Sequence, residues 1–205
     1  MIVIIDNSDC FTFNLVQYVR ELAVGVPLRV VGNTEVPAIE VLGWQPRAVF
    51  LADGPGRPEQ AGMSLELVRL AGETPILGVG LGYEAVAVAY GGQVVAVSQA
   101  RHSRSSEVFH NGLGVFAGLP DSFIAARFRS FVVRRESLPG ELIVTAWTRN
   151  GLIMGLQHRD RPHSGVQFHP ESYLTHTGKR LIGNFLAAAG ISAPLSCSPD
   201  GASHS

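Results

Sequence analysis

Three short motifs in this chain combine residue types that enzymes use for acyl transfer, and the first is the glycine-rich turn Gly78–Tyr83. The apolar run 75–79 predicts a strand, and a helix is expected to follow without a linker. This layout is typical of a nucleophile elbow, where the central side chain stands at the end of a sheet and a helix N-terminus can stabilise an anion. The central residue is Gly80, which has no side chain, and a glycine-rich turn that never held a nucleophile gives the same pattern.

The other two motifs supply polar groups of complementary kinds. In His169-Pro170-Glu171 a carboxylate two residues from an imidazole can orient the ring and fix its tautomer. In Asp53-Gly54-Pro55-Gly56, glycines at a strand exit let backbone N–H groups approach a ligand closely. Taken singly, these are also the patterns of two exposed polar residues around a proline and of an ordinary turn. Together, in this order and spacing, the three motifs indicate an active site much more specifically than any one of them does.

The elements that would position these motifs alternate along the chain. Short β-rich runs, of which 3–5 is continuously apolar, predict strands at 3–5, 28–31, 48–51, 75–79 and 165–168. Helix-like stretches predict helices at 11–22, 63–71, 83–90 and 178–189. This order predicts right-handed crossovers and a doubly wound, mostly parallel α/β sheet flanked by helices. Alternating segments at 130–134 and 142–147 predict antiparallel strands, and the expected fold class includes a smaller antiparallel sheet. Ligands bind at the carboxyl ends of parallel strands, so the loops starting at Asp6, Asp53, Gly80 and His169 are expected to meet there.

Composition narrows the functional classes. The 205 residues, 46% apolar and 16% charged, predict one globular domain over 1–190, with a disordered tail at 191–205. A net charge of -1 gives no basis for nucleic acid binding, and the basic group Arg101–Arg104 is interpreted as solvated surface. No apolar run approaches the roughly 20 residues that span a bilayer, and no signal peptide is recognised. Two distant cysteines, Cys10 and Cys197, indicate no disulfide and a cytoplasmic location.

Taken together, the motifs resemble those of the class I glutamine amidotransferases, most closely the small subunit of anthranilate synthase and aminodeoxychorismate synthase. The similarity runs from residue 1 to about 189. Residues 6–15 are similar to the opening motif of that subgroup, and 165–172, which read GVQFHPES, match the family's histidine–glutamate motif throughout. Segments 110–112, 114–116 and 119–120 also follow the subgroup pattern.

This resemblance implies a flavodoxin-like fold and a reaction in which a cysteine attacks the side-chain amide of glutamine. The released ammonia passes to a component I-type synthase, the expected partner, which aminates chorismate. His169 matches the general base and acid, and Glu171 matches the residue that orients it. Gly54 and Leu81 match the positions whose backbone amides form the oxyanion hole. The pocket is further expected to include Gly56, Tyr83, Glu84 and Ser130. No metal and no cofactor are expected.

The chain departs from the family at the elbow, which reads G-V-C-L-G-H-Q in the family and GVGLGYE at 78–84 here. Gly80 stands at the cysteine position, so no thiolate is present for the thioester step. Loss of the nucleophile costs triad enzymes on the order of 10⁶ in rate. Glu84 replaces a glutamine that helps to hold the substrate; a carboxylate cannot donate a hydrogen bond and would repel the substrate's own carboxylate. Glutamine hydrolysis by the usual mechanism is therefore not expected.

Other pocket positions have changed as well. The family's S-P-G-P-G loop reads ADGPG at 52–56, its H-G-K stretch reads HSR at 102–104, and its H-S-L stretch reads RSF at 129–131. Several positions differ while the scaffold motifs are kept, which favours natural divergence over a single engineered substitution. Cys10 is an alternative nucleophile, although we interpret it as a local capping or packing residue in place of a serine of the family motif.

Three functions are consistent with this pattern. The first is a subunit that binds a chorismate-utilising synthase in a structural or regulatory role. The second is a repurposed hydrolase or acyl-transfer enzyme that uses His169 and Glu171, with Tyr83 and Glu84 as further acid–base groups. The third is an engineered Cys-to-Gly variant of an active glutaminase.

Overall fold

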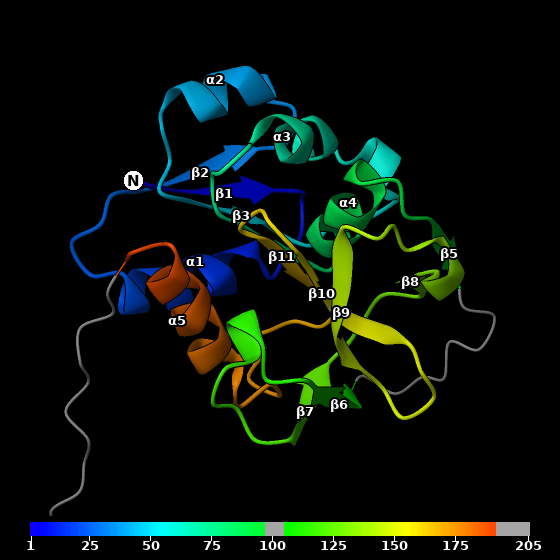
Figure 1. The fold of residues 1–205 in the computed structure, drawn as a ribbon. Helices are drawn as coiled ribbons and strands as arrows, with labels where there is room; N and C mark the ends of the chain where they lie inside the picture. The colour runs from blue at the N-terminus through cyan, green and yellow to red at the C-terminus, as the bar shows by residue number, and fades with distance from the viewer. Residues whose placement is uncertain (97–104, 192–205) are drawn as a thin grey trace, which may run out of the picture.

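The structure is a computed structural model that describes residues 1–96 and 105–191, and a large twisted sheet forms its centre (Figure 1). In sheet order the strands are β2 (Leu28–Gly32), β1 (Ile2–Asp6), β3 (Ala48–Leu51), β4 (Ile76–Val79), β11 (His163–Val166), β10 (Ile153–His158), β9 (Leu142–Trp147), β6 (Ser105–His110) and β7 (Ser122–Ala126). Neighbouring strands from β2 to β11 are parallel, and those from β11 to β7 are antiparallel. A separate antiparallel pair joins β5 (Val94–Ala96) to β8 (Phe131–Val133).

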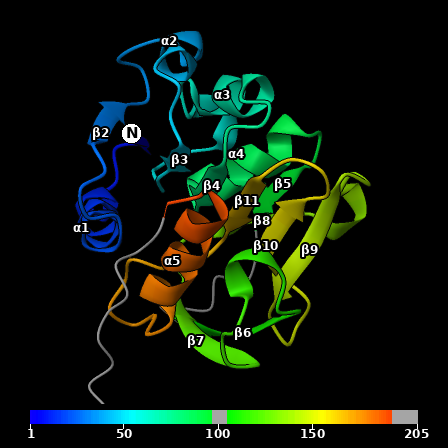
Figure 2. The same ribbon diagram turned by 60° about the vertical axis from the view of Figure 1, so that its left-hand side comes forward.

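Helices cover both faces of the parallel half of the sheet (Figures 1 and 2). On one face α1 (Thr12–Leu22) packs against α5 (Gly178–Ala188); on the other lie α2 (Ala38–Gly43), α3 (Ser64–Leu70) and α4 (Leu81–Ala89). Short 3₁₀ turns occupy Pro58–Gln60, Gly114–Phe116 and Arg135–Ser137. The predicted fold class, a doubly wound and mostly parallel sheet with a smaller antiparallel sheet, is therefore confirmed.

The central strands are buried on both faces, which explains their continuous apolar sequences. Along β1, Ile2 and Ile4 belong to the core beneath α1 and α5, whereas Val3 and Ile5 belong to the core beneath α2, α3 and α4. Successive side chains of a strand point to opposite faces, so both faces of a strand covered by helices must be apolar. The burial of Leu15, Val16 and Val19 on one stripe of α1 follows the helical period in the same way.

Two elements next to the predicted motifs begin earlier than the sequence indicated. The helix expected at 83–90 begins at Leu81, since Gly80 completes the turn by itself with φ +55° and ψ −109°. The strand expected at 165–168 is β11, two residues earlier, because the chain leaves the sheet at Gln167. The structure also contains α2, β6, β7 and β10, which the sequence analysis did not identify.

Two further sets of predictions concern membrane-spanning segments and residues outside the described ranges. Among the described residues, no helix combines the length and apolarity needed to cross a membrane. The basic group at 101–104, the HSR stretch within it, Cys197 and nearly all of the predicted tail lie outside the described residues.

Candidate functional site

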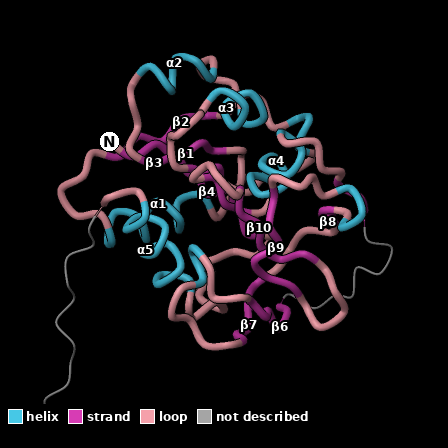
Figure 3. Tube along the Cα trace, viewed as in Figure 1, coloured by secondary structure: helices cyan, strands magenta, loops and turns pink. Residues whose placement is uncertain are grey.

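The candidate site lies where loops leave the carboxyl ends of the parallel strands (Figure 3). The loops after β3, β4 and β11 carry Asp53, Gly80 and His169 respectively. The connection between β7 and β8 adds Arg129. His169 is held against this connection because its backbone N–H donates to the carbonyl of Ala126 at 2.9 Å. Open α/β sheets bind ligands at this edge, so the predicted loops do meet in the expected place.

Gly80 has the backbone geometry of an elbow, and the space above it is filled. Its φ of +55° lies in the left-handed region that favours glycine, and its carbonyl accepts from the N–H of Glu84 at 3.0 Å. A Cβ atom built on Gly80 would overlap the carboxylate of Asp53, coming within 2.8 Å even of the farther oxygen, Oδ2. The volume that a side chain at this position would need is therefore occupied by Asp53.

The two oxygens of Asp53 contact different parts of the site. Oδ1 accepts a hydrogen bond from the backbone N–H of Leu81 at 2.6 Å, at the first residue of α4. Oδ2 lies 3.1 Å from Nε2 of His169. A carboxylate at a helix N-terminus is favoured by the free N–H groups there. Burial raises the pKa of Asp53, but the contacts with His169 and Arg129 outweigh it and lower that pKa overall.

His169 and Glu171 form the predicted imidazole–carboxylate pair. Nδ1 of His169 lies 2.6 Å from Oε1 of Glu171, and both side chains are buried. Burial lowers the pKa of His169, but the carboxylates of Asp53 and Glu171 raise it further, to about 10. The ring is therefore an imidazolium at neutral pH, with one carboxylate against each nitrogen. Nδ1 forms the hydrogen bond to Glu171, whereas the approach of Nε2 to Asp53 is an ion-pair contact without hydrogen-bond geometry. With both nitrogens protonated, the ring has no lone pair with which to act as a general base.

Glu84 is completely buried and is paired with Arg129. The sequence indicated Arg129 only as a difference from the family's H-S-L stretch, and did not indicate this pairing. Arg129 donates from Nε to Oε1 of Glu84 at 2.7 Å and from Nη2 to Oε2 at 2.8 Å. Burial raises the pKa of Glu84, and the guanidinium opposes this shift. Because the contact is bidentate and charge-assisted, Glu84 is ionised and neutralised within the protein. Its charge is thus directed at Arg129 and not at a substrate.

Arg129 also reaches the loop that follows β3. Its Nη1 lies 3.3 Å from Oδ1 of Asp53 and donates to the carbonyl of Gly54, while Nη2 donates to the carbonyl of Gly56 at 2.8 Å. Gly54 passes so close to Asn7 that a Cβ would overlap the Asn7 backbone, and Gly56 has a φ of +79°. The two predicted glycines therefore shape a loop whose carbonyls surround a guanidinium.

Tyr83 and Ser130 have separate placements. The Tyr83 side chain is fully buried in the core beneath α2, α3 and α4, and its hydroxyl donates to the carbonyl of Ile153 at 3.2 Å. It is not part of the polar cluster, and burial raises its pKa well above the usual value. Ser130 lines a shallow groove of about 530 Å³ beside Asp53 and Gly54. The structure therefore brings Ser130, but not the Tyr83 side chain, to the site.

Aromatic rings cover the outer side of His169. Phe11 and Phe128 stack with their centroids 5.4 Å apart, and these centroids lie 5.5 and 4.9 Å from that of the His169 ring. Cys10, the alternative nucleophile, is exposed and precedes the first helical residue of α1 by two positions. Its Sγ contacts Asp9 and not His169.

A metal ion could use one potential ligand set at this site. Asp9, His169 and Glu171 each offer a ligand atom within 4.8 Å of the others. However, both ring nitrogens of His169 already face carboxylates at hydrogen-bonding distance, and Asp9 accepts from the backbone N–H of Phe11 at 3.1 Å. The arrangement is that of an ion cluster in which both ring nitrogens face carboxylates of the protein.

Comparison with known proteins gives consistent results. The family model "Glutamine amidotransferase class-I" matches residues 3–189. Anthranilate synthase component 2 of Pseudomonas aeruginosa is 45% identical over 196 residues, covering 93% of this chain and 96% of that protein. Aminodeoxychorismate synthase component 2 of Escherichia coli is 44% identical over 187 residues, covering 91% and 99%. The crystal structure of a glutamine amidotransferase from Thermotoga maritima has the same fold, with a TM-score of 0.74, 15% identity, and coverage of 92% and 96%.

Proposed function

Because this chain belongs to the class I glutamine amidotransferase family, we propose that it is a component II-type subunit that binds a chorismate-utilising synthase without supplying it with ammonia from glutamine. The role is structural or regulatory. The synthase then takes free ammonia or carries out a reaction that needs no nitrogen donor.

One observation carries this proposal, namely the occupation of the nucleophile's place by an acidic side chain. Gly80 offers no thiolate, and the space above it holds the carboxylate of Asp53. Hydrolysis of a carboxamide through a thioester needs a nucleophile at that point and a free N–H group for the oxyanion. The N–H of Leu81 already donates to Asp53. Both requirements are therefore unmet in the same small region.

The likeness to component 2 proteins supports the proposed partner. Identities of 45% and 44% extend over almost the whole described chain, which supports a retained scaffold. A subunit that had lost both its chemistry and its partner would have no reason to keep that scaffold at this level.

The test is reconstitution with a candidate synthase encoded nearby. The synthase alone and the synthase with this chain are each assayed with ammonium, with glutamine, and without a nitrogen source. We expect the two proteins to co-purify, and we expect glutamine to give no more product than the reaction without a nitrogen source. Glutamine-dependent product, or the absence of a complex together with unchanged synthase activity, would contradict the proposal.

A second candidate is a reused site, and the buried His169–Glu171 pair favours it. A scaffold has no chemical need for an oriented imidazole, and the 2.6 Å contact is that of an intact dyad. For this candidate, replacing His169 by glutamine must abolish formation of the biological product. Product formed at the full rate would eliminate it. The third possibility, an engineered single substitution, receives no support from a pocket in which Asp53 and Glu84 both pair with Arg129.

A further inference from the structure

The position of Asp53 suggests more than the loss of a reaction, because its carboxylate makes the contacts that a reacting group would make. One oxygen receives the hydrogen bond of the Leu81 N–H, where an oxyanion would be stabilised. The other faces Nε2 of His169, where a nucleophile would exchange its proton. The carboxyl carbon lies so close to the point where a Cβ at position 80 would stand that the two would overlap. A single side chain thus occupies three places that belong to different participants in the family's reaction.

We propose that Asp53 is a built-in ligand of the former glutaminase cleft, held there by Arg129 and Glu84, and that it determines which molecules the cleft excludes. The inference rests on the proposed loss of glutaminase chemistry and adds the residue that closes the site. It makes Asp53 a positioning residue that acts through His169 and Arg129.

Asp53 is part of a cluster of five charged side chains whose charges depend on one another. Three carboxylates, from Asp53, Glu84 and Glu171, are paired with two cations, Arg129 and His169, so the cluster has one more negative than positive charge. All five side chains are almost fully buried. A buried charge that loses its partner is strongly unfavourable, so no member can be changed alone without leaving another uncompensated. Asp53 is the member in contact with both cations.

The same arrangement excludes a carboxamide substrate. To reach the N–H of Leu81, the carbonyl oxygen of an amide would have to displace an anion that also contacts Arg129 and His169. A neutral amide oxygen is a weaker acceptor than a carboxylate, and displacement would take from each of two buried cations one of its two carboxylate partners. The place of the nucleophile at the groove is therefore filled by the protein's own carboxylate, and replacing Gly80 by cysteine is not enough to free it.

The experiment uses the isolated chain with Cys10 and Cys197 replaced by serine, so that an introduced thiol is the only one. Gly80→Cys alone is compared with Gly80→Cys combined with Asp53→Ala, and alkylation by iodoacetamide is followed from about pH 5 to about pH 9. A carboxylate beside the thiol disfavours the thiolate, whereas an unpaired imidazolium favours it. Near pH 6 we expect the thiol of the double variant to react at least about tenfold faster than the thiol of Gly80→Cys alone. A fall of one unit in the thiol pKa gives a tenfold larger thiolate fraction at such a pH.

A matched control separates this effect from a general loss of negative charge. Gly80→Cys with Glu59→Ala removes an exposed carboxylate from the same loop region and should react like Gly80→Cys alone. Equal rates for Gly80→Cys with and without Asp53→Ala would overturn the proposal. A control variant as fast as the Asp53 variant would do so as well.

A second measurement avoids the strain of a side chain at position 80. The titration of the His169 ring is followed by NMR in the wild type and in Asp53→Asn, which keeps the shape and removes the charge. We expect the midpoint to fall by at least about one unit, a tenfold loss of proton affinity. An unchanged midpoint would show that Asp53 does not hold the ring. Neither measurement involves a synthase, so a failed reconstitution and a failed assignment of Asp53 are separate results.

Discussion

Nε2 of His169 lies 3.1 Å from Oδ2 of Asp53, and this contact joins the loop that follows β11 to the loop that follows β3. The imidazole retains the orienting carboxylate, Glu171, on its other nitrogen. A ring that would exchange a proton with a nucleophile is here fixed as a cation between two anions. In this arrangement the His169–Glu171 pair contributes to the electrostatic stability of the ion cluster.

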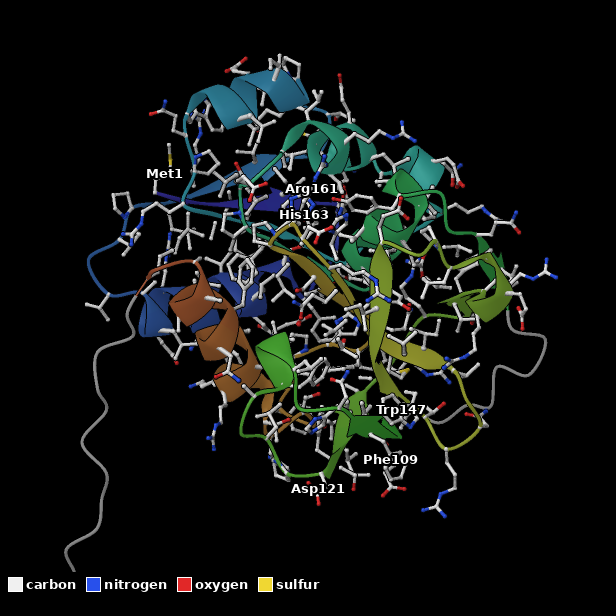
Figure 4. All side chains as sticks on the ribbon, in the orientation of Figure 1. Met1, Phe109, Asp121, Trp147, Arg161 and His163 are labelled. Atoms are coloured by element: carbon white, nitrogen blue, oxygen red, sulfur yellow. The ribbon has the colours of Figure 1, made fainter. Side chains whose placement is uncertain are left out.

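The first prediction concerns alkaline pH. The folded pKa of His169, about 10, exceeds the ordinary value of 6.5, so its stabilisation is complete below about pH 6.5 and is lost as pH rises through about 10. We expect Asp53→Asn to lower the free energy of unfolding by about 3 kcal/mol at neutral pH, and we expect this difference to shrink towards pH 10. Urea denaturation at several pH values measures this. Asp121→Asn, which changes an exposed carboxylate just before β7 (Figure 4), should follow the wild type.

The second prediction concerns the elbow. Gly80→Ala places a Cβ against Asp53 at a positive φ, and we expect a loss of roughly 1–3 kcal/mol in the free energy of unfolding. Combined with Asp53→Ala, it should lower the free energy of unfolding by less than the sum of the two single losses. The reason is that Asp53→Ala removes the carboxylate with which the new Cβ clashes. The matched control is Gly183→Ala in α5, where nothing lies within 4 Å of the new Cβ. This control should be stabilising by about 0.5–1 kcal/mol. Strict additivity at 53 and 80 would contradict the filled-space interpretation.

The third prediction concerns the buried ion pair. Arg129→Ala leaves Glu84 and Asp53 without their guanidinium, and we expect a loss of about 3–5 kcal/mol in unfolding free energy. Arg149→Ala removes an exposed arginine from a 3.5 Å pair with Glu107 and should cost less than about 1 kcal/mol. Adding Glu84→Gln to Arg129→Ala should recover part of the loss. If both arginine variants have the same stability, the Arg129 network does not hold the loops together.

The fourth prediction concerns glutamine itself. We expect no glutamine-dependent rise in the melting temperature of the wild type, because the N–H of Leu81 and the imidazole of His169 are already engaged by Asp53. A ligand that binds only the folded state must raise that temperature, so differential scanning fluorimetry is sufficient. Ammonia release is measured in parallel. Saturable stabilisation by glutamine would show that the cleft still opens to the substrate.

The fifth prediction concerns acid. His163 in β11 is buried, its Nδ1 lies 2.7 Å from the hydroxyl of Tyr90, and Arg161 lies nearby (Figure 4). Burial, aided by the charge of Arg161, lowers the pKa of His163 to about 4. The unfolded chain therefore binds a proton that the folded chain excludes, and stability falls as pH drops from about 6.5 to about 4.

We expect His163→Gln to show a shallower loss of unfolding free energy over this acid range than the wild type. The reference is the difference in unfolding free energy between the two proteins above about pH 7.5. At that pH the His163 ring of the wild type is neutral in both the folded and the unfolded state. Parallel stability curves would show that His163 does not cause the acid sensitivity.

The parallel half of the fold could be predicted from the sequence because its strands are buried on both faces. Continuous apolar runs such as 48–51 leave little ambiguity, and β3 occupies those residues. α2 was missed because six residues are too few to establish a helical period. β10 was missed because Gly155, Gln157 and His158 interrupt its apolar pattern, although five of its six residues are buried.

The site was predictable in its location and in its His169–Glu171 pair, both of which follow from local spacing. The contacts of Asp53 and Arg129 join residues 28 to 116 positions apart, and no local pattern specifies such pairs. One indication was present in the sequence. Glu84 lies in the otherwise apolar helix 81–89, and a carboxylate in such a helix requires a buried cation.

The place of β11 in the sheet has a consequence for synthesis of the chain. β11 is the last strand in sequence, yet it lies between β4 and β10 and is the strand that links the parallel half to the antiparallel half. Until residues 163–166 have left the ribosome, β4 and β10 each present an unpaired edge, and exposed edges are prone to pair with other chains. Joining two halves through such a late segment makes the final folding step long-range and slow. His169 lies three residues after the end of β11, so the ion cluster around it can close only when that step is complete.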